Sequence, residues 1–209
     1  MGVRADSSGT RLFLKQARED FLRIGAIAPS SRFLARAVTS LLADHGAPLR
    51  VLEAGAGTGA LTSEILRRMP AGSTLDIYEI NPTFARHLAE RFGSHRNVAV
   101  WNKAVEEVSA QPSYDAIISG LPLNNFQPSA VRSTLAALFA ALRPGGALTY
   151  FEYMLIREIK SLATGRKERR RLRKVGRVTG GYLRRYEFQR EAVFLNIPPA
   201  LVHHLRKPR

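Results

Sequence analysis

A glycine-rich turn between a short apolar segment and an amphipathic segment constrains the fold of this chain more than any other feature. Residues 49–54 form an apolar run typical of a buried strand, and the run leads into Glu53-Ala54-Gly55-Ala56-Gly57-Thr58-Gly59. In residues 61–69, which follow, apolar side chains recur at helical spacing. Glycines between a strand and a helix allow a tight turn and let a ligand lie directly on the backbone. The segment therefore predicts an α/β unit with a ligand site at its turn.

The alternation of strand and helix continues as far as residue 153. We expect strands at 74–79, 97–101, 114–119 and 147–153, helices at 83–92 and 130–142, and a weak helix near Val105. Strands that alternate with helices across short turns specify a parallel sheet with helices on both faces. Ligands bind such sheets outside the carboxyl ends of the strands. Any binding residues should therefore follow these strands directly.

Two acidic residues indicate what kind of ligand the turn binds. Glu79 stands twenty residues beyond Gly59 at the end of the second strand, where a carboxylate can accept both ribose hydroxyls of an adenosine. This spacing fits a dinucleotide or another adenosyl cofactor. Glu53 directly precedes the glycines, where its charge would repel a pyrophosphate but suits an amino group or a sulfonium. The pair favours a cationic adenosyl cofactor.

The pattern E-x-G-x-G-x-G with Glu79 downstream resembles motifs I and II of the class I S-adenosylmethionine-dependent methyltransferases. The resemblance implies a Rossmann-like, mostly parallel seven-stranded sheet and S-adenosyl-L-methionine as cofactor, with S-adenosyl-L-homocysteine as product. It also implies a cofactor site made of Glu53, Gly55, Gly57, Thr58 and Gly59 around the amino acid part, Glu79 and Ile80 at the ribose, Asn102, Lys103 and Ala104 at the adenine, and Ser119, Gly120 and Leu121 after the fourth strand.

The loop after the fourth strand and the end of the fifth are the expected acceptor side. Ser119-Gly120-Leu121-Pro122-Leu123 resembles the N-P-P-Y loop of amino-methylating members, with Leu123 in the aromatic place. Losing that ring removes about 1–3 kcal/mol of base stacking, which argues against a nucleobase substrate. The predicted catalytic residues are Ser119, Glu152 as proton acceptor or ammonium anchor, and Tyr153. Ring faces near the strand ends can stabilise a cationic product, and the candidates are Tyr150, Phe151, Tyr153 and Phe126.

The chain as a whole resembles the bacterial phospholipid N-methyltransferases, from residues 25–31 through the glycine turn to 196–200. That resemblance implies stepwise methylation of phosphatidylethanolamine through its mono- and dimethyl forms toward phosphatidylcholine. The family also looks like the ribosomal RNA adenine dimethylases. Methylation of a nucleic acid is therefore the alternative, and a basic chain suits it equally well.

The charge distribution points to a polyanionic surface. The chain carries a net charge of +15, and residues 157–190 contribute +10 of it, with the densest run at 166–174. Residues 11–24 form a basic amphipathic helical pattern with Phe13 and Phe21 on the apolar face and Arg18 opposite. By the resemblance, residues 1–28 are a membrane-binding helix and residues 29–209 the methyltransferase domain. A basic insertion at 160–180 would then hold lipid phosphates through Arg169, Arg170, Arg173 and Lys174.

Composition excludes several other kinds of protein. No apolar run is long enough to span a bilayer, and the N-terminus lacks the apolar core of a secretory signal. We therefore expect a cytoplasmic protein, peripheral on the inner face of the cytoplasmic membrane. The absence of cysteine excludes disulfides and thiolate metal sites, and the five histidines form no convincing ligand set, so no metal is predicted.

Overall fold

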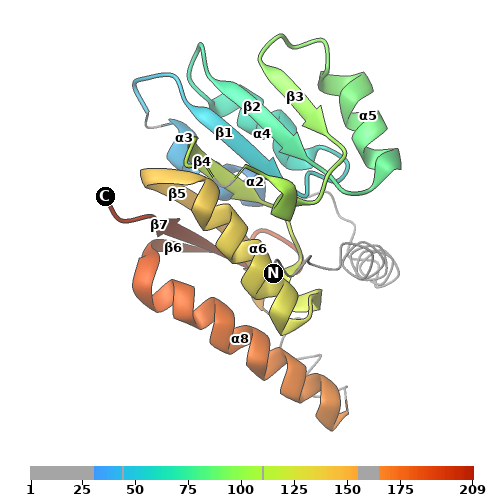
Figure 1. The fold of residues 1–209 in the computed structure, drawn as a ribbon, viewed down its shortest axis with the longest axis vertical. Coiled ribbons are helices and arrows are strands. Elements are labelled where there is room, and N and C mark those ends of the chain that lie inside the picture. The colour runs from blue at the N-terminus through green and yellow to red at the C-terminus, as the bar shows by residue number, and fades with distance from the viewer. Residues whose placement is uncertain (1–30, 44, 110, 155–164) are drawn as a thin grey trace, which may run out of the picture.

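A seven-stranded sheet with the strand order β3-β2-β1-β4-β5-β7-β6 organises the molecule (Figure 1). The structure is a computed structural model that describes residues 31–43, 45–109, 111–154 and 165–209. The strands are β1 (Arg50–Ala54), β2 (Thr74–Tyr78), β3 (Val98–Trp101), β4 (Tyr114–Ser119), β5 (Leu142–Tyr153), β6 (Glu187–Val193) and β7 (Ala200–Arg206). The first five run parallel, and β7 is antiparallel to both β5 and β6. The predicted mostly parallel, seven-stranded Rossmann-like sheet is confirmed.

Helices cover both faces of the sheet and bury two apolar clusters. On one face lie α2 (Arg32–Val38), α3 (Ser40–Ala43), α4 (Ala60–Arg68) and α5 (Pro82–Phe92). The other face carries the 3-10 turns η1 (Val105–Glu107) and η2 (Leu123–Asn125) and the helices α6 (Pro128–Ala141) and α8 (Arg166–Tyr186). Ile117 and Ile118 of β4 point into opposite clusters, as expected for a central strand buried on both sides.

Local sequence signals account for several helix boundaries. Gly59 has φ +83°, a left-handed conformation that suits glycine, and it leads into α4. Asn81 caps α5 by accepting hydrogen bonds from Thr83 N and Phe84 N, and Pro82 occupies the first helical position. Ser31 caps α2 through its hydroxyl. The weak helix expected near Val105 is the single turn η1.

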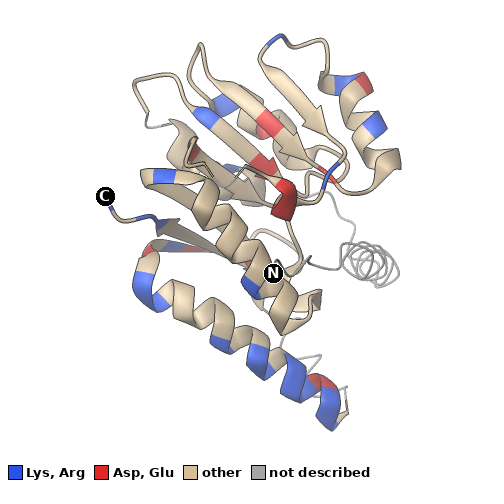
Figure 2. Ribbon diagram, viewed as in Figure 1, with Lys and Arg blue, Asp and Glu red and all other residues tan. Residues whose placement is uncertain are grey.

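The basic run at 166–174 opens a 21-residue helix, α8, for which the sequence analysis assigned no secondary structure. Its apolar side buries Leu172, Val175 and Thr179, and the rings of Tyr182 and Tyr186 lie 5.0 and 4.7 Å from that of Phe139 in α6. Lys and Arg follow one another along α8, whereas both signs are interspersed elsewhere (Figure 2). The helix therefore combines a core-packing face with an exposed basic face.

The hairpin of β6 and β7 is tied to the start of α2. The Asn196 side chain lies in the turn between these strands, where its Oδ1 accepts a hydrogen bond from Ser31 N at 3.1 Å and its Nδ2 donates one to Pro198 O at 2.7 Å. The bond to Ser31 joins the ends of the chain segment that the sequence resemblance spans. The predicted N-terminal helix, with Phe13, Arg18 and Phe21, lies outside the described residues. Among the described helices, none is long and apolar enough to cross a bilayer.

Candidate active site

The glycine turn and the loop after β4 meet at the carboxyl edge of the parallel strands. Gly55 N donates a hydrogen bond to Tyr78 O at 2.8 Å, and Gly120 N donates one to Ala54 O at 2.9 Å. The turn after β1 is thus held between the ends of β2 and β4. This is the edge at which open α/β sheets bind their ligands.

Close packing requires glycine at two points of this edge. Gly55 has φ +73°, and a Cβ there would lie 2.6 Å from Cδ2 of Leu121. A Cβ on Gly120 would lie 2.9 Å from the carbonyl oxygen of Gly55. A side chain at Gly120 would push the two loops apart, and one at Gly55 would be strained by the positive φ and would displace Leu121. The glycines therefore keep a bare backbone surface open to a ligand.

Glu79 connects the glycine turn to the turn after β2. Its Oε2 accepts a hydrogen bond from Gly57 N and its Oε1 one from Asn81 N, both at 2.9 Å. The residue is 2% exposed. Two backbone donors therefore hold the carboxylate in one orientation at the expected ribose position. The sequence analysis missed Asn81, although its position before a proline is a helix-start signal.

Glu53 is a buried carboxyl with one oxygen lacking a partner. Thr62 of α4 donates a 2.6 Å hydrogen bond to Oε2, while Oε1 is buried and has no hydrogen-bond partner among the described residues. Burial raises the pKa of Glu53 to about 8; the hydrogen bond from Thr62 lowers this pKa and the charge of Glu79 raises it. A buried oxygen of this kind beside a glycine turn fits a ligand ammonium or sulfonium. The residues present therefore fit S-adenosylmethionine.

The predicted adenine residues follow β3. Asn102 Nδ2 donates to the carbonyl oxygens of Glu79 at 2.9 Å and Ile80 at 3.1 Å, so this amide group holds the turn after β2. Lys103 is exposed, with Nζ 5.2 Å from the ring centre of Trp101. The backbone nitrogen of Ala104 donates to Glu107 Oε1 at the start of η1. The side chain of Asn102 therefore supports the turn that follows β2, a role that spacing did not reveal.

The predicted acceptor residues lie along β4 and β5. Ser119 pairs in register with Tyr150, and its Oγ accepts a 3.4 Å hydrogen bond from Leu121 N. Glu152 and Tyr153 are two and three residues farther along β5, roughly 7 and 10 Å beyond Ser119. Tyr153 packs edge-on against Phe151, and burial raises the pKa of its phenol, which stays neutral at physiological pH.

The other two rings considered for the acceptor side belong to the protein core. Tyr150 is 1% exposed and stacks on His203 at 5.1 Å, and Phe126 is 2% exposed. Of the four candidate rings, Phe151 and Tyr153 are the two that are partly exposed at the strand end.

Comparison with known proteins agrees with this geometry. A family model described as "Methyltransferase domain" matches residues 51–146. An ornithine lipid N-methyltransferase from Singulisphaera acidiphila is 30% identical over 149 residues, which cover 68% of this chain and 77% of the relative. The chain belongs to the class I S-adenosylmethionine-dependent methyltransferases.

Solved structures support the fold of this methyltransferase. The 1,6-didemethyltoxoflavin-N1-methyltransferase of Burkholderia thailandensis, crystallised with S-adenosylhomocysteine, matches with a TM-score of 0.64 and 20% identity over 100% of this chain and 93% of its own. The N-methyltransferase NodS of Bradyrhizobium japonicum, also with S-adenosylhomocysteine, matches with a TM-score of 0.63 and 15% identity, covering 94% and 99%. At these identities the similarity concerns the fold.

Arg171 anchors α8 of the methyltransferase to its acceptor loop. Its side chain is 13% exposed and pairs with Glu168 at 2.5 Å. It also donates hydrogen bonds to the carbonyl oxygens of Asn124, at 2.8 Å, and Phe126. Sequence reasoning counted Arg171 within the charge run, although the buried neighbour Leu172 and the acid three residues earlier are signals of a packed position.

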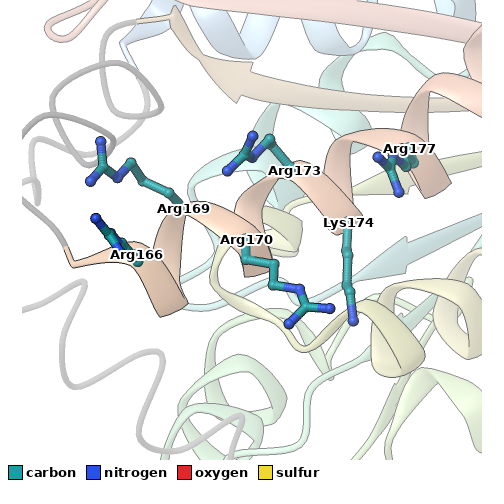
Figure 3. Close-up of a pocket in the computed structure, with 6 residues that line it drawn as sticks. All are labelled: Arg166, Arg169, Arg170, Arg173, Lys174 and Arg177. Carbon is teal, nitrogen blue, oxygen red and sulfur yellow. The ribbon is translucent and has the colours of Figure 1, made fainter.

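Six other cations of α8 form a basic stripe on its exposed face. They line an open hollow of about 680 Å³ and comprise Arg166, Arg169, Arg170, Arg173, Lys174 and Arg177 (Figure 3). Spacings of three and four residues bring them to one helix face. The four cations predicted from the sequence lie together on this stripe, joined by Arg166 and Arg177.

Proposed function

We propose that this methyltransferase methylates the amine of phosphatidylethanolamine and of its mono- and dimethyl forms, toward phosphatidylcholine, at an anionic membrane surface. The observation that carries the proposal is the basic stripe on a helix anchored to the acceptor loop. The ornithine lipid N-methyltransferase among the relatives also acts, by its name, on a lipid amine.

The stripe supplies the electrostatic part of membrane binding. A basic residue near an anionic bilayer contributes about 1 kcal/mol, so six of them contribute several kcal/mol at low salt. Because Arg171 fastens the same helix to Asn124, lipid phosphates on the stripe would lie beside the loop that begins at Ser119. A headgroup amine is then close to the carboxyl edge of the sheet.

The residues at this edge suit transfer to nitrogen. S-adenosylmethionine supplies the activated methyl group when bound. The Ser119 hydroxyl and the backbone of the following loop orient the acceptor amine. Desolvation at this edge lowers the pKa of the amine and favours its neutral form, with Glu152 as the proton acceptor. The rings of Phe151 and Tyr153 lie on the face of β5 opposite Glu152, so they are the alternative contacts at this strand end and would stabilise a cationic product by about 0.5–2 kcal/mol each.

Nucleic acid methylation is the second candidate, because the basic stripe would also suit a phosphate backbone. The acceptor loop favours lipid. Leu123 takes the aromatic place of the base-methylating loop and is 3% exposed, so it offers no ring on which a base stacks.

One assay compares the two substrates directly. The protein is incubated with radiolabelled S-adenosylmethionine and either vesicles of phosphatidylethanolamine and phosphatidylglycerol or undermethylated ribosomal RNA. We expect label in the lipid, resolved by chromatography into mono-, di- and trimethyl species, and far less label with Glu79→Ala at the same cofactor concentration. Label in RNA with none in lipid would refute the proposal and assign the stripe to a nucleic acid backbone.

A further inference from the structure

The turn between β6 and β7 exposes three large apolar side chains within four residues. Phe194 is 70% exposed, Leu195 69% and Ile197 85%, whereas the other exposed large apolar residues of the described chain are near 40%. We call Phe194, Leu195 and Ile197 the apolar tip. Single exposed apolar residues are ordinary, but a group of them on one turn marks a contact surface.

The backbone of this turn is held in place while its apolar side chains point outward. Asn196, between Leu195 and Ile197, is 4% exposed and bonds to Ser31 N and Pro198 O. Met154 N at the end of β5 donates a 2.9 Å hydrogen bond to Pro199 O. The polar residue of the turn thus faces the protein, and its apolar neighbours face solvent.

The apolar tip lies at the same edge of the sheet as the active site. Val193, the last residue of β6, and Tyr153, the last of β5, both pair with Ala200, so the turn extends beyond the carboxyl end of β5. Ser119 and Ala54 end the neighbouring parallel strands β4 and β1 at that edge. The helix that carries the basic stripe, α8, is held at this edge too, because its Arg171 bonds to Asn124 in the acceptor loop.

We propose that the apolar tip inserts into the boundary between headgroups and acyl chains of an anionic phospholipid bilayer, while the basic stripe binds the headgroups. The proposal rests on the lipid function proposed above and adds the element that enters the bilayer. The six cations of the stripe support this occupant, because an apolar turn and a basic helix at the same edge of the sheet complement an anionic bilayer in polarity and charge.

The two contributions to binding respond differently to salt. The attraction of the stripe is screened, with a Debye length that falls from about 10 Å at 0.1 M salt to about 3 Å at 1 M. Burial of the tip is apolar and is not screened in this way. Each inserted side chain contributes up to about a tenfold gain in affinity.

A fluorescence experiment tests insertion directly. The chain contains no cysteine, so Leu195→Cys provides one attachment point for an environment-sensitive dye. Ala71→Cys is the matched control, since Ala71 is exposed and precedes β2 at the opposite edge of the sheet. With phosphatidylethanolamine–phosphatidylglycerol vesicles, we expect a blue shift and quenching by spin-labelled acyl chains at 195 and neither at 71. A dye at 195 that stays in water on vesicle-bound protein would overturn the proposal, as would a blue shift without vesicles.

Two sets of variants separate the tip from the stripe. Replacing all three tip residues by serine should weaken vesicle binding by about a hundredfold and leave its salt dependence unchanged. Replacing Arg170, Lys174 and Arg177 by glutamine should reduce the salt dependence instead. Cofactor binding, measured by calorimetry, reports that each variant is folded.

The two proposals fail in distinguishable ways. Insertion of the dye without any lipid methylation would refute the proposed substrate and leave the tip as a membrane element. If the protein methylates lipid and the serine variant binds vesicles as tightly as the parent, insertion of the apolar tip is refuted and the proposed substrate stands.

Discussion

Glu53→Gln should stabilise the ligand-free methyltransferase at alkaline pH while it weakens cofactor binding. The buried carboxyl has a pKa of about 8 in the folded protein against an ordinary value of 4.5. Since the unfolded chain ionises first, the carboxyl contributes full stability below pH 4.5, and this is lost as pH rises to 8. At 1.36 kcal/mol per pKa unit, the loss is on the order of 5 kcal/mol. Glutamine keeps the shape of the side chain without the ionisation.

Urea unfolding between pH 4.5 and 9 measures this effect. The difference in unfolding free energy between variant and parent should grow with pH and level off above pH 8, because other groups titrate alike in both proteins. Glu90→Gln, on the exposed side of α5, makes the same charge change and should show no such trend. A pH-independent difference for Glu53→Gln would refute the account of this carboxyl.

Cofactor affinity provides a second measurement, and it should rise with pH, whereas the stability of the ligand-free protein falls. A cationic amino group binds the ionised carboxylate, so binding near pH 7 should release close to one proton, measurable by calorimetry in buffers of different ionisation enthalpy. Affinity should fall about tenfold between pH 7 and pH 6 in the parent and stay nearly flat in the variant. Proton release that persists in Glu53→Gln would assign it to another group.

Three further substitutions test the remaining supports of the site. Glu79→Ala removes the acceptor of two backbone N–H groups and should lower cofactor affinity about a hundredfold, while vesicle binding persists; equal methylation would refute the ribose assignment. Arg171→Met should cost about 2–4 kcal/mol in urea unfolding because it removes one ion pair to Glu168 and the donor to two carbonyl oxygens, whereas Arg170→Met should stay within about 0.5 kcal/mol. Equal effects would contradict the anchoring role. Gly55→Ala should cost about 2 kcal/mol or more and abolish cofactor binding, because its φ of +73° strains an alanine and its Cβ meets Leu121, whereas Gly181→Ala, in open space within α8, should gain about 0.5–1 kcal/mol. A Gly55→Ala protein that binds cofactor normally would contradict the packing of the two loops.

The strand and helix positions of the middle region were predictable because they follow from local patterns. Apolar runs located β1 to β4 to within one residue, and helical spacing located α4, α5 and α6 to within two. The glycine turn was equally predictable from the sequence, because the positive φ of Gly55, Gly57 and Gly59 is a local backbone requirement. The sequence analysis did not place α8, β6 or β7. Dense charge conceals the helical period of α8, the residues of β6 are mostly exposed, and β7 is buried on both faces and so shows no alternation.

The sequence by itself determined the fold class and the glycine turn at the carboxyl edge of the sheet, because strand alternation, glycine conformation and residue spacing are properties of neighbouring residues. The basic run was also evident in the sequence, but the sequence did not show which of its residues are buried and which are exposed. Only the tertiary structure separated Arg171, buried against the acceptor loop, from the exposed stripe around it. Tertiary packing likewise paired Glu53 with Thr62 and brought the apolar tip to the active-site edge. Arg171 and its partner Asn124 are 47 residues apart in the chain, and the burial that sets the charge state of Glu53 exists only after folding.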